Sequence, residues 1–131
     1  MQIMLDTNVL VSAALFPKSK TAQALSIATR EHKLVVCTYV LDEVQSVFEK
    51  KFPNKIDNLD KFMPNLAYEL CYTSKIDDKT PEMRDEDDRP ILQAALDAEV
   101  DAILIGDKDF HVLDIERPMI LSPADFLEHY H

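Results

Sequence analysis

Five short, nearly uninterrupted apolar runs most constrain what this chain can fold into. They are Gln2–Leu5, Lys33–Cys37, Glu69–Tyr72, Ala102–Ile105 and Pro118–Leu121. A strand exposed on one face alternates apolar and polar residues, whereas a strand covered on both faces is apolar throughout. The runs therefore predict a single three-layer α/β/α domain with a central, mainly parallel sheet. The sheet has four or five strands, depending on whether Glu69–Tyr72 pairs.

Segments with helical period lie between these runs. The predicted helices are Asn8–Leu15, Thr21–Glu31, Tyr39–Lys50, Ile56–Tyr68, Arg89–Ala98 and Pro123–Glu128. Thr38, Asp88 and Ser122 stand where N-caps are expected, immediately before the first helical residue. Pro64 lies inside the fourth segment, and it is expected to kink or divide that helix.

The chain length and the two cysteines indicate an ordinary folded domain. A chain of 131 residues fits one domain, spanning residues 1–131, with enough apolar residues for a core. Cys37 and Cys71 lie in apolar runs without a CxxC pair, so both are predicted to be buried free thiols. No apolar run approaches the roughly 18 residues of a membrane span, and no apolar leader precedes the first strand. We expect a cytoplasmic protein.

The strongly acidic charge limits how the chain could bind nucleic acid. It has 14 basic and 24 acidic residues, for a formal net charge of −10. That balance argues against a broad surface that neutralises phosphates. It does not exclude a nucleic-acid enzyme, because carboxylates gathered around divalent metal would let the metal supply the positive charge.

Acidic residues follow the predicted strands at the edge where parallel sheets bind ligands. Asp6 ends the first strand, and Asp107 and Asp109 follow the fourth run across Gly106. The acidic stretch 85–88 leads into the helix before that run. In open parallel sheets, ligands bind outside the carboxyl ends of the strands. These carboxylates are therefore candidates for one shared site.

A further candidate carboxylate lies within the helix that follows the second strand. In TYVLDEVQSVF, steps of 100° per residue place Val40, Val44 and Phe48 on one face, with Glu43 on its border and Asp42 nearly opposite. Asp42 is predicted to face solvent. Glu43 is predicted to point along the margin of the core, towards the strand ends.

Each of these residues also has a purely structural interpretation. Asp6, Thr7 or Asp88 could be only an N-cap, Glu43 could reach water from the helix border, and residues 107–109 could form a polar turn. Taken together they favour a site, because carboxylates that converge from separate parts of a chain repel one another unless a cation holds them. Hard divalent ions prefer such oxygen ligands.

Three stretches of the sequence together resemble the PIN domain family, in particular the toxins of VapBC-type toxin-antitoxin pairs. LDTNVLVSA resembles the family's first strand and Asp-x-Asn turn, and LDEVQSVF resembles the helix that carries its glutamate. RDEDDRPILQAALDAEVDAILIGDKDF resembles the third block, from an acidic loop through helix and strand to Gly-Asp-Lys-Asp. Two departures are Ile105, where the family often has threonine, and Glu86, where it often has proline.

The resemblance implies a PIN-like fold and a specific site. The implied metal ligands and catalytic residues are Asp6, Glu43, Asp88 and Asp107, with Thr7 and Asn8 in support, Asp109 as a reserve ligand and Lys108 as a phosphate contact. It implies an endoribonuclease that uses Mg²⁺ or Mn²⁺ to hydrolyse RNA, held by a cognate antitoxin protein and paired as a homodimer.

Two other classes of function are weighed against this one, a binding module and an aspartate enzyme of another kind. A PIN-like module that only binds, without catalysis, would share the fold, although all four expected acids are present. A receiver domain would need a lysine after the last strand, where this chain has Ser122 and Pro123, and a phosphatase of the haloacid dehalogenase type would need aspartate at Asn8. Both of these aspartate enzymes are disfavoured.

Overall fold

A parallel sheet builds the centre of the molecule. The computed structural model describes residues 1–73, 89–106 and 115–130. The strands are β1 (Gln2–Leu5), β2 (Lys33–Cys37), β3 (Tyr68–Cys71), β4 (Ala102–Leu104) and β5 (Met119–Leu121). They form one five-stranded sheet in the order β3-β2-β1-β4-β5, and every neighbouring pair is parallel. β1 therefore lies in the middle, with Met4 paired to both Val35 and Ile103.

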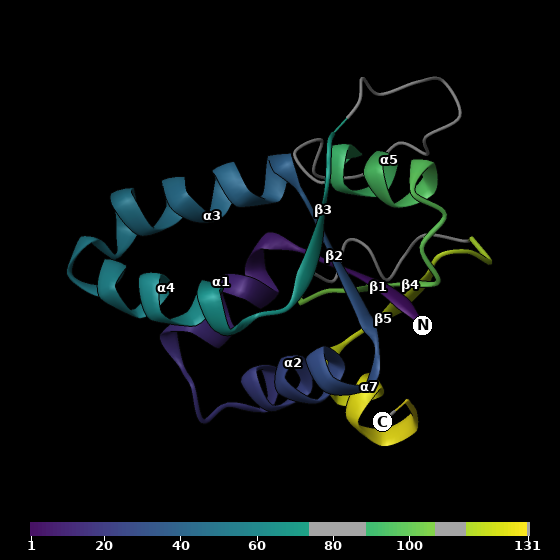
Figure 1. The fold of residues 1–131 in the computed structure, drawn as a ribbon, viewed down its shortest axis with the longest axis horizontal. Coiled ribbons are helices and arrows are strands. Elements are labelled where there is room, and N and C mark those ends of the chain that lie inside the picture. The colour runs from purple at the N-terminus through teal and green to yellow at the C-terminus, as the bar shows by residue number, and fades with distance from the viewer. Residues whose placement is uncertain (74–88, 107–114, 131) are drawn as a thin grey trace.

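Helices cover both faces of this sheet, as Figure 1 shows. The helices are α1 (Thr7–Leu15), α2 (Lys20–Glu31), α3 (Thr38–Lys51), α4 (Ile56–Phe62), α5 (Arg89–Asp97) and α7 (Pro123–His129), with short 3₁₀ turns η1 (Pro53–Lys55) and η2 (Met63–Asn65). α2 packs against α7 on one side, and α3 packs against α5 on the other. α1 contacts α2, α3 and α4, so it joins the two groups.

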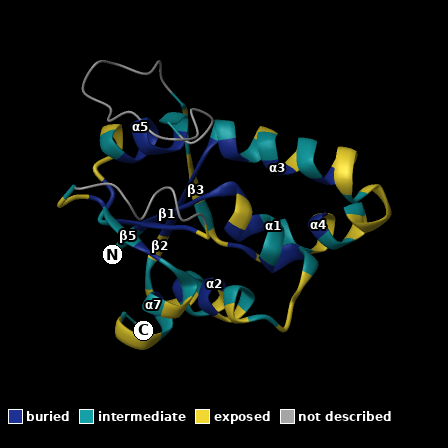
Figure 2. Ribbon diagram, turned by 180° about the vertical axis from the view of Figure 1, so that it is seen from behind, coloured by how far each residue is buried: buried dark blue, intermediate teal, exposed yellow. Residues whose placement is uncertain are grey.

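Burial follows the layers that the apolar runs predict. Leu5, Val36 and Ile103 are fully buried, and the helices turn a buried side inward and an exposed side outward (Figure 2). Phe48 of α3 and Phe126 of α7 are the largest buried side chains, and they lie in helices packed on opposite faces. Within the described ranges, no helix is long and apolar enough to cross a membrane. The predicted α/β class with a parallel sheet is confirmed.

The segment Ile56–Tyr68 is divided at Pro64, as predicted, but the prediction that it is helical as far as Tyr68 was wrong. α4 stops at Phe62, a 3₁₀ turn carries Pro64, and Tyr68 already belongs to β3. Proline has no N–H for the helical ladder, and its ring clashes with the preceding turn, so the helix cannot continue through it. β3 consequently starts one residue before the predicted Glu69 and ends at Cys71.

Two predicted caps have different outcomes. Ser122 caps α7 with a reciprocal capping box, since its hydroxyl accepts from the Asp125 N–H and the Asp125 carboxylate accepts from the Ser122 N–H. Thr38 is not an N-cap, because it is the first residue of α3, and the cap position falls on Cys37 with no side-chain hydrogen bond to the helix. The Thr38 hydroxyl bonds Thr73 instead.

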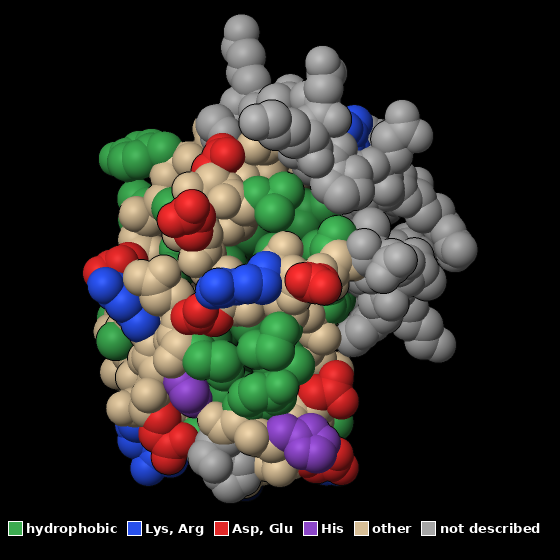
Figure 3. Space-filling model, turned by 90° about the vertical axis from the view of Figure 1, so that its right-hand side faces the viewer, with side chains coloured by type: hydrophobic (Ala, Val, Ile, Leu, Met, Phe, Trp, Pro, Cys, Tyr) green, Lys and Arg blue, Asp and Glu red, His purple; other side chains and the backbone are tan. Residues whose placement is uncertain are grey.

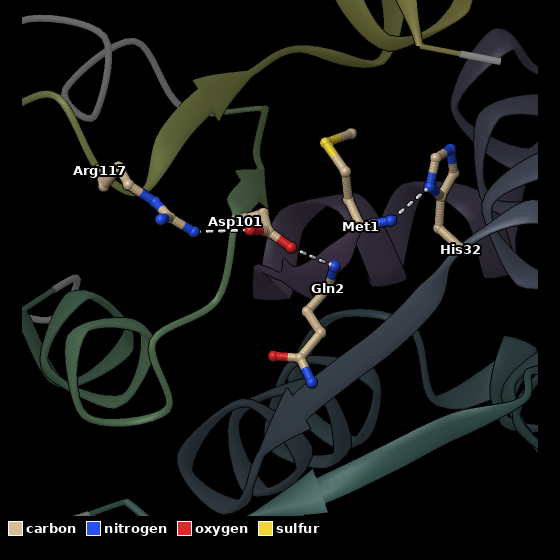
Figure 4. A network of polar contacts seen from close by, with 5 residues as sticks. All are labelled: Met1, Gln2, His32, Asp101 and Arg117. Carbon is tan, nitrogen blue, oxygen red and sulfur yellow. Dashed lines mark hydrogen bonds and ion pairs between the residues drawn. The ribbon is translucent and has the colours of Figure 1, made fainter.

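A polar network ties the strands together at their amino ends, opposite the predicted site (Figure 4). Asp101 accepts from the Gln2 N–H at 2.7 Å and pairs with Arg117 at 2.6 Å. His32 Nδ1 lies 3.0 Å from the Met1 amino group, and its Nε2 lies 2.8 Å from the Tyr130 carbonyl oxygen.

The side of the molecule at the right of Figure 1 has acidic and basic side chains interspersed, with apolar groups between them (Figure 3).

The two cysteines stand side by side on β2 and β3, and we expect both to react slowly. Cys37 is buried, but Cys71 is only half-buried, so the prediction of two buried thiols was wrong for Cys71, which lies on the edge strand. Burial raises the pKa of Cys37. Burial, with Cys37 and Asp97 nearby, raises the pKa of Cys71 to about 11.

At pH 8 only about one in a thousand Cys71 thiols is ionised, and burial lowers the ionised fraction of Cys37 as well. The thiolate is the reactive form. Both thiols should therefore react with Ellman's reagent at least about 10-fold more slowly in the native protein than in guanidinium chloride. Equal rates in the two conditions, followed by absorbance at pH 8, would contradict this expectation.

Candidate functional site

The order of the strands makes the seam between β1 and β4 a topological switch point. β1 leads through α1 and α2 to β2 on one side of it, and β4 pairs with β1 on the other side. In open parallel sheets, such a switch point leaves a crevice outside the carboxyl ends of the two strands, because their connections diverge. The residues that follow β1 and β4 are therefore the ones to inspect for a binding site.

Asp6 lies at this switch point, directly after β1. Its N–H donates to the Leu104 carbonyl oxygen at 3.3 Å, which extends the pairing with β4 by one residue. Its Oδ1 accepts from the Val9 N–H at 2.8 Å, so Asp6 is the N-cap of α1. The residue is only 2% exposed. The capping interpretation is thus correct, and it fixes the position of a buried carboxylate, which is costly to bury without compensating partners.

Thr7 and Asn8 begin α1 beside this switch point. Thr7 is buried, whereas Asn8 is exposed. A Cβ atom on Gly106 would lie 4.0 Å from the Asn8 Cβ atom. Gly106 follows the last residue of β4 by two positions, so the chain that leaves β4 passes beside the N-terminus of α1. The ends of β1 and β4 thus meet at one place, as the motif positions predict.

Glu43 reaches the same place from α3. Thr7 Oγ1 donates a hydrogen bond to Glu43 Oε1, and the Tyr39 hydroxyl donates to Glu43 Oε2 at 3.2 Å. The side chain is half-buried, between buried Val44 and exposed Asp42, so the predicted position at the border of the apolar face is confirmed. Through Thr7, the Glu43 carboxylate is joined to the residue that follows Asp6.

Tyr39 is a member of this site that the sequence reasoning missed, since it was treated only as the start of a helix. Its N–H donates to Thr73 Oγ1 at 3.0 Å, and the Thr73 N–H donates to Thr38 Oγ1 at 3.1 Å. These bonds join the first turn of α3 to the end of β3. The spacing of Tyr39 and Glu43 was the available signal, because residues four apart lie on the same side of a helix.

Four of the predicted site residues, Asp88, Asp107, Lys108 and Asp109, lie outside the described residues. Of the part of the chain that the structure describes, no group of three or more histidine, cysteine or acidic side chains could hold a metal ion. Asp6 and Glu43 are the described members of the predicted set. Both offer only carboxylate oxygens, and the neighbouring Thr7 and Asn8 add oxygen and amide groups, a donor set that fits Mg²⁺ or Mn²⁺ and not a softer ion.

Comparisons with known proteins identify the family of the chain. Residues 2–109 match the PIN domain family. No curated protein matches the sequence. Among solved structures, the chain is similar to one in the crystal structure of VapBC2 from Rickettsia felis bound to a DNA fragment from their promoter. The TM-score is 0.70 at 18% identity, over 93% of this chain and 98% of that chain. At that identity the structural likeness shows the fold, and the family match extends over most of the chain: the protein belongs to the PIN domain family.

Proposed function

We propose that this chain is an endoribonuclease that uses Mg²⁺ or Mn²⁺ to hydrolyse phosphodiester bonds in single-stranded regions of RNA. Its metal ligands are Asp6, Glu43, Asp88 and Asp107. The observation that supports this most is the buried Asp6 carboxylate at the β1/β4 switch point, with the Glu43 carboxylate joined to its neighbour Thr7. Membership of the PIN domain family, in which metal-dependent nucleases are general, supports it independently.

The acidic charge of the chain agrees with this proposal. A net charge of −10 would repel RNA from a bare protein surface. A divalent cation bound among the carboxylates would reverse the charge locally, act as a Lewis acid on the phosphate and activate water for attack. The RNA backbone is then drawn to the one place where the carboxylates meet.

Each residue has a distinct task in this proposal. Asp6 holds the metal from the end of β1, in an orientation fixed by the Val9 N–H. Glu43 is a further ligand or orients the attacking water, because its two oxygens are fixed by hydroxyl groups. Thr7 and Asn8 support these carboxylates at the start of α1.

The remaining proposed residues complete the set. Asp88 and Asp107 are ligands, Asp109 acts as a reserve ligand through water, and Lys108 contacts a phosphate. An ammonium group beside the carboxylates suits a non-bridging phosphate oxygen.

We also propose that the chain is the toxin of a toxin-antitoxin pair and acts in the cytoplasm as a homodimer. The structurally similar chain comes from the crystal structure of VapBC2 from Rickettsia felis bound to a DNA fragment from their promoter. The cognate antitoxin is expected to hold a basic side chain among the carboxylates, where metal or RNA would bind. Co-expression with the product of an adjacent short reading frame should suppress RNA cleavage, and light scattering at micromolar concentration should show a dimer. A monomer would remove only the dimer proposal.

A pair of adjacent acidic residues on α3 tests the proposed function. Glu43→Gln should lower the rate of RNA cleavage by roughly 10- to 100-fold, because an amide is a poorer ligand than a carboxylate of the same shape. Asp42→Asn removes the same charge from the exposed neighbour and should leave the rate unchanged. The measurement is cleavage of a labelled single-stranded RNA with Mg²⁺ or Mn²⁺.

Equal loss in both variants would show that general charge, not the site, matters. A chain that binds Mn²⁺ in a calorimetric titration but cleaves no RNA would instead be a PIN module without catalysis, and the nuclease proposal would fail.

A further inference from the structure

The Glu43 carboxylate has a hydroxyl donor on each of its two oxygens. Thr7 Oγ1, from α1, donates to Oε1, and the Tyr39 hydroxyl, from the first turn of α3, donates to Oε2 at 3.2 Å. A carboxylate oxygen has two acceptor positions, and among the described residues each Glu43 oxygen has one donor. The two donors therefore fix the plane of the carboxylate.

Tyr39 is itself held in place, so the position of its hydroxyl group is fixed. Its ring is half-buried and packs against the hydrophobic core. Its N–H donates to Thr73 Oγ1 at 3.0 Å, which ties the first turn of α3 to the end of β3. A tyrosine side chain has two rotatable torsions, and burial restricts both. Little rotamer freedom remains to be lost when its hydroxyl bonds Glu43.

Glu43, in contrast, would be loosely held without these donors. It is half-buried, and a glutamate side chain has several rotatable torsions, so fixing it in one arrangement costs rotamer entropy. Hydrogen bonds from neighbouring groups orient metal-ligating side chains, and their loss commonly weakens metal binding by about 10- to 100-fold. We propose that Tyr39 is a positioning residue that acts through Glu43 to set the affinity of the site for a divalent cation. This inference rests on the proposed metal site.

Tyr39→Phe tests the inference, because it keeps the ring and removes only the hydroxyl oxygen. The dissociation constant for Mn²⁺ should rise about 10-fold, while the melting temperature without metal stays within a few degrees of wild type. Mn²⁺ binding is measured by calorimetric titration and, for weak variants, by the rise in melting temperature that millimolar Mn²⁺ produces. Tyr68→Phe makes the same change in a half-buried tyrosine of β3 and should leave Mn²⁺ binding unchanged.

A double-mutant cycle separates positioning through Glu43 from a direct or general effect. In a Glu43→Gln background, Tyr39→Phe should cause no further loss of Mn²⁺ affinity, since the carboxylate that it positions is gone. Thr7→Ser, which keeps the other hydroxyl donor, should bind Mn²⁺ like wild type, whereas Thr7→Val should weaken it.

The inference is wrong if Tyr39→Phe binds Mn²⁺ like wild type, or if it weakens binding equally with and without the Glu43 carboxylate. These titrations contain no RNA. A tyrosine-dependent Mn²⁺ site in a chain that cleaves no RNA would leave the inference standing and remove the ribonuclease proposal. A wild-type chain that binds no Mn²⁺ would overturn both.

Discussion

Asp6→Asn is expected to abolish RNA cleavage while the chain remains folded. Asparagine caps helices as well as aspartate does, so the bond from the Val9 N–H to residue 6 can persist. The change removes one negative charge from the proposed cluster, and the loss of cleavage should be on the order of 1,000-fold, the scale for a group that stabilises developing charge. Without metal, the melting temperature should stay the same or rise, because repulsion among carboxylates falls.

Asp6→Ala separates the two roles of this residue. Alanine cannot accept the Val9 hydrogen bond, so this variant should lose both the cleavage activity and about 1 kcal/mol of stability. Asp42→Asn is the matched control for charge. Millimolar Mn²⁺ should raise the melting temperature of wild type but not of Asp6→Asn. If Asp6→Asn instead melted lower without metal and still cleaved RNA, Asp6 would be a cap and nothing more.

Removal of metal is expected to abolish cleavage completely, and the cut RNA should carry 5′-phosphate and 3′-hydroxyl ends. The proposed cluster suits hard cations, so water should be the nucleophile. Nucleases that use histidine can employ the RNA's own 2′-hydroxyl and need no metal. Of the histidines in the described part of the chain, His32 bonds Met1 and Tyr130 at the amino ends of the strands, and His129 lies beside Glu128 in the last turn of α7.

The assay combines EDTA treatment with analysis of the RNA ends. Activity should return when Mg²⁺ or Mn²⁺ is added in excess of EDTA, and blocking the 2′-hydroxyl at the cut site should not in itself prevent cleavage. An Asp6→Asn preparation made in parallel controls for contaminating nuclease. Cyclic 2′,3′-phosphate ends, or undiminished cleavage in EDTA by wild type alone, would contradict the mechanism.

The central strands could be predicted because almost every residue in them is apolar, as burial on both faces requires. Gln2–Leu5 and Lys33–Cys37 form strands with the predicted bounds, since each is apolar almost throughout. β4 ends at Leu104, one residue before the predicted Ile105, yet the Ile105 N–H still donates to the Leu121 carbonyl oxygen at 2.9 Å. The difference affects only the residue at which the strand is said to end, and not the path of the backbone.

The edge strand and the helix before it were harder to predict. β3 lies at the edge of the sheet, and its sequence YELC includes exposed Glu69 and Leu70, so neither apolar content nor alternation marks its ends. Pro64 indicates that the preceding helix breaks, but not that the chain resumes as a strand by Tyr68. The local sequence predicts the break in the helix, whereas pairing with β2 determines that the next segment is a strand.

The sequence predicts which positions belong to the candidate site, but it does not predict which of their side chains are in contact. Strand ends and helix period located Asp6 and Glu43 correctly on the same edge. The bond between Glu43 and Thr7 depends on how α1 packs against α3, and no spacing within either helix specifies that crossing. Tyr39 differs, because it lies on the same helix as Glu43, four residues earlier, and its contact follows from helical geometry alone.

The central place of β1 also sets when such a site could first exist during synthesis of the chain. β1 is made first, but one of its two partners is β4, and the bond from Gln2 to Asp101 spans 99 residues. At a translation rate of about 5–20 residues per second, β1 waits roughly 5–20 s before this partner has been made. The pairing of β1 with β4, and with it the position of Asp6 between them, is therefore among the last parts of the domain to form. Any activity that depends on this seam can begin only after β4 has been made.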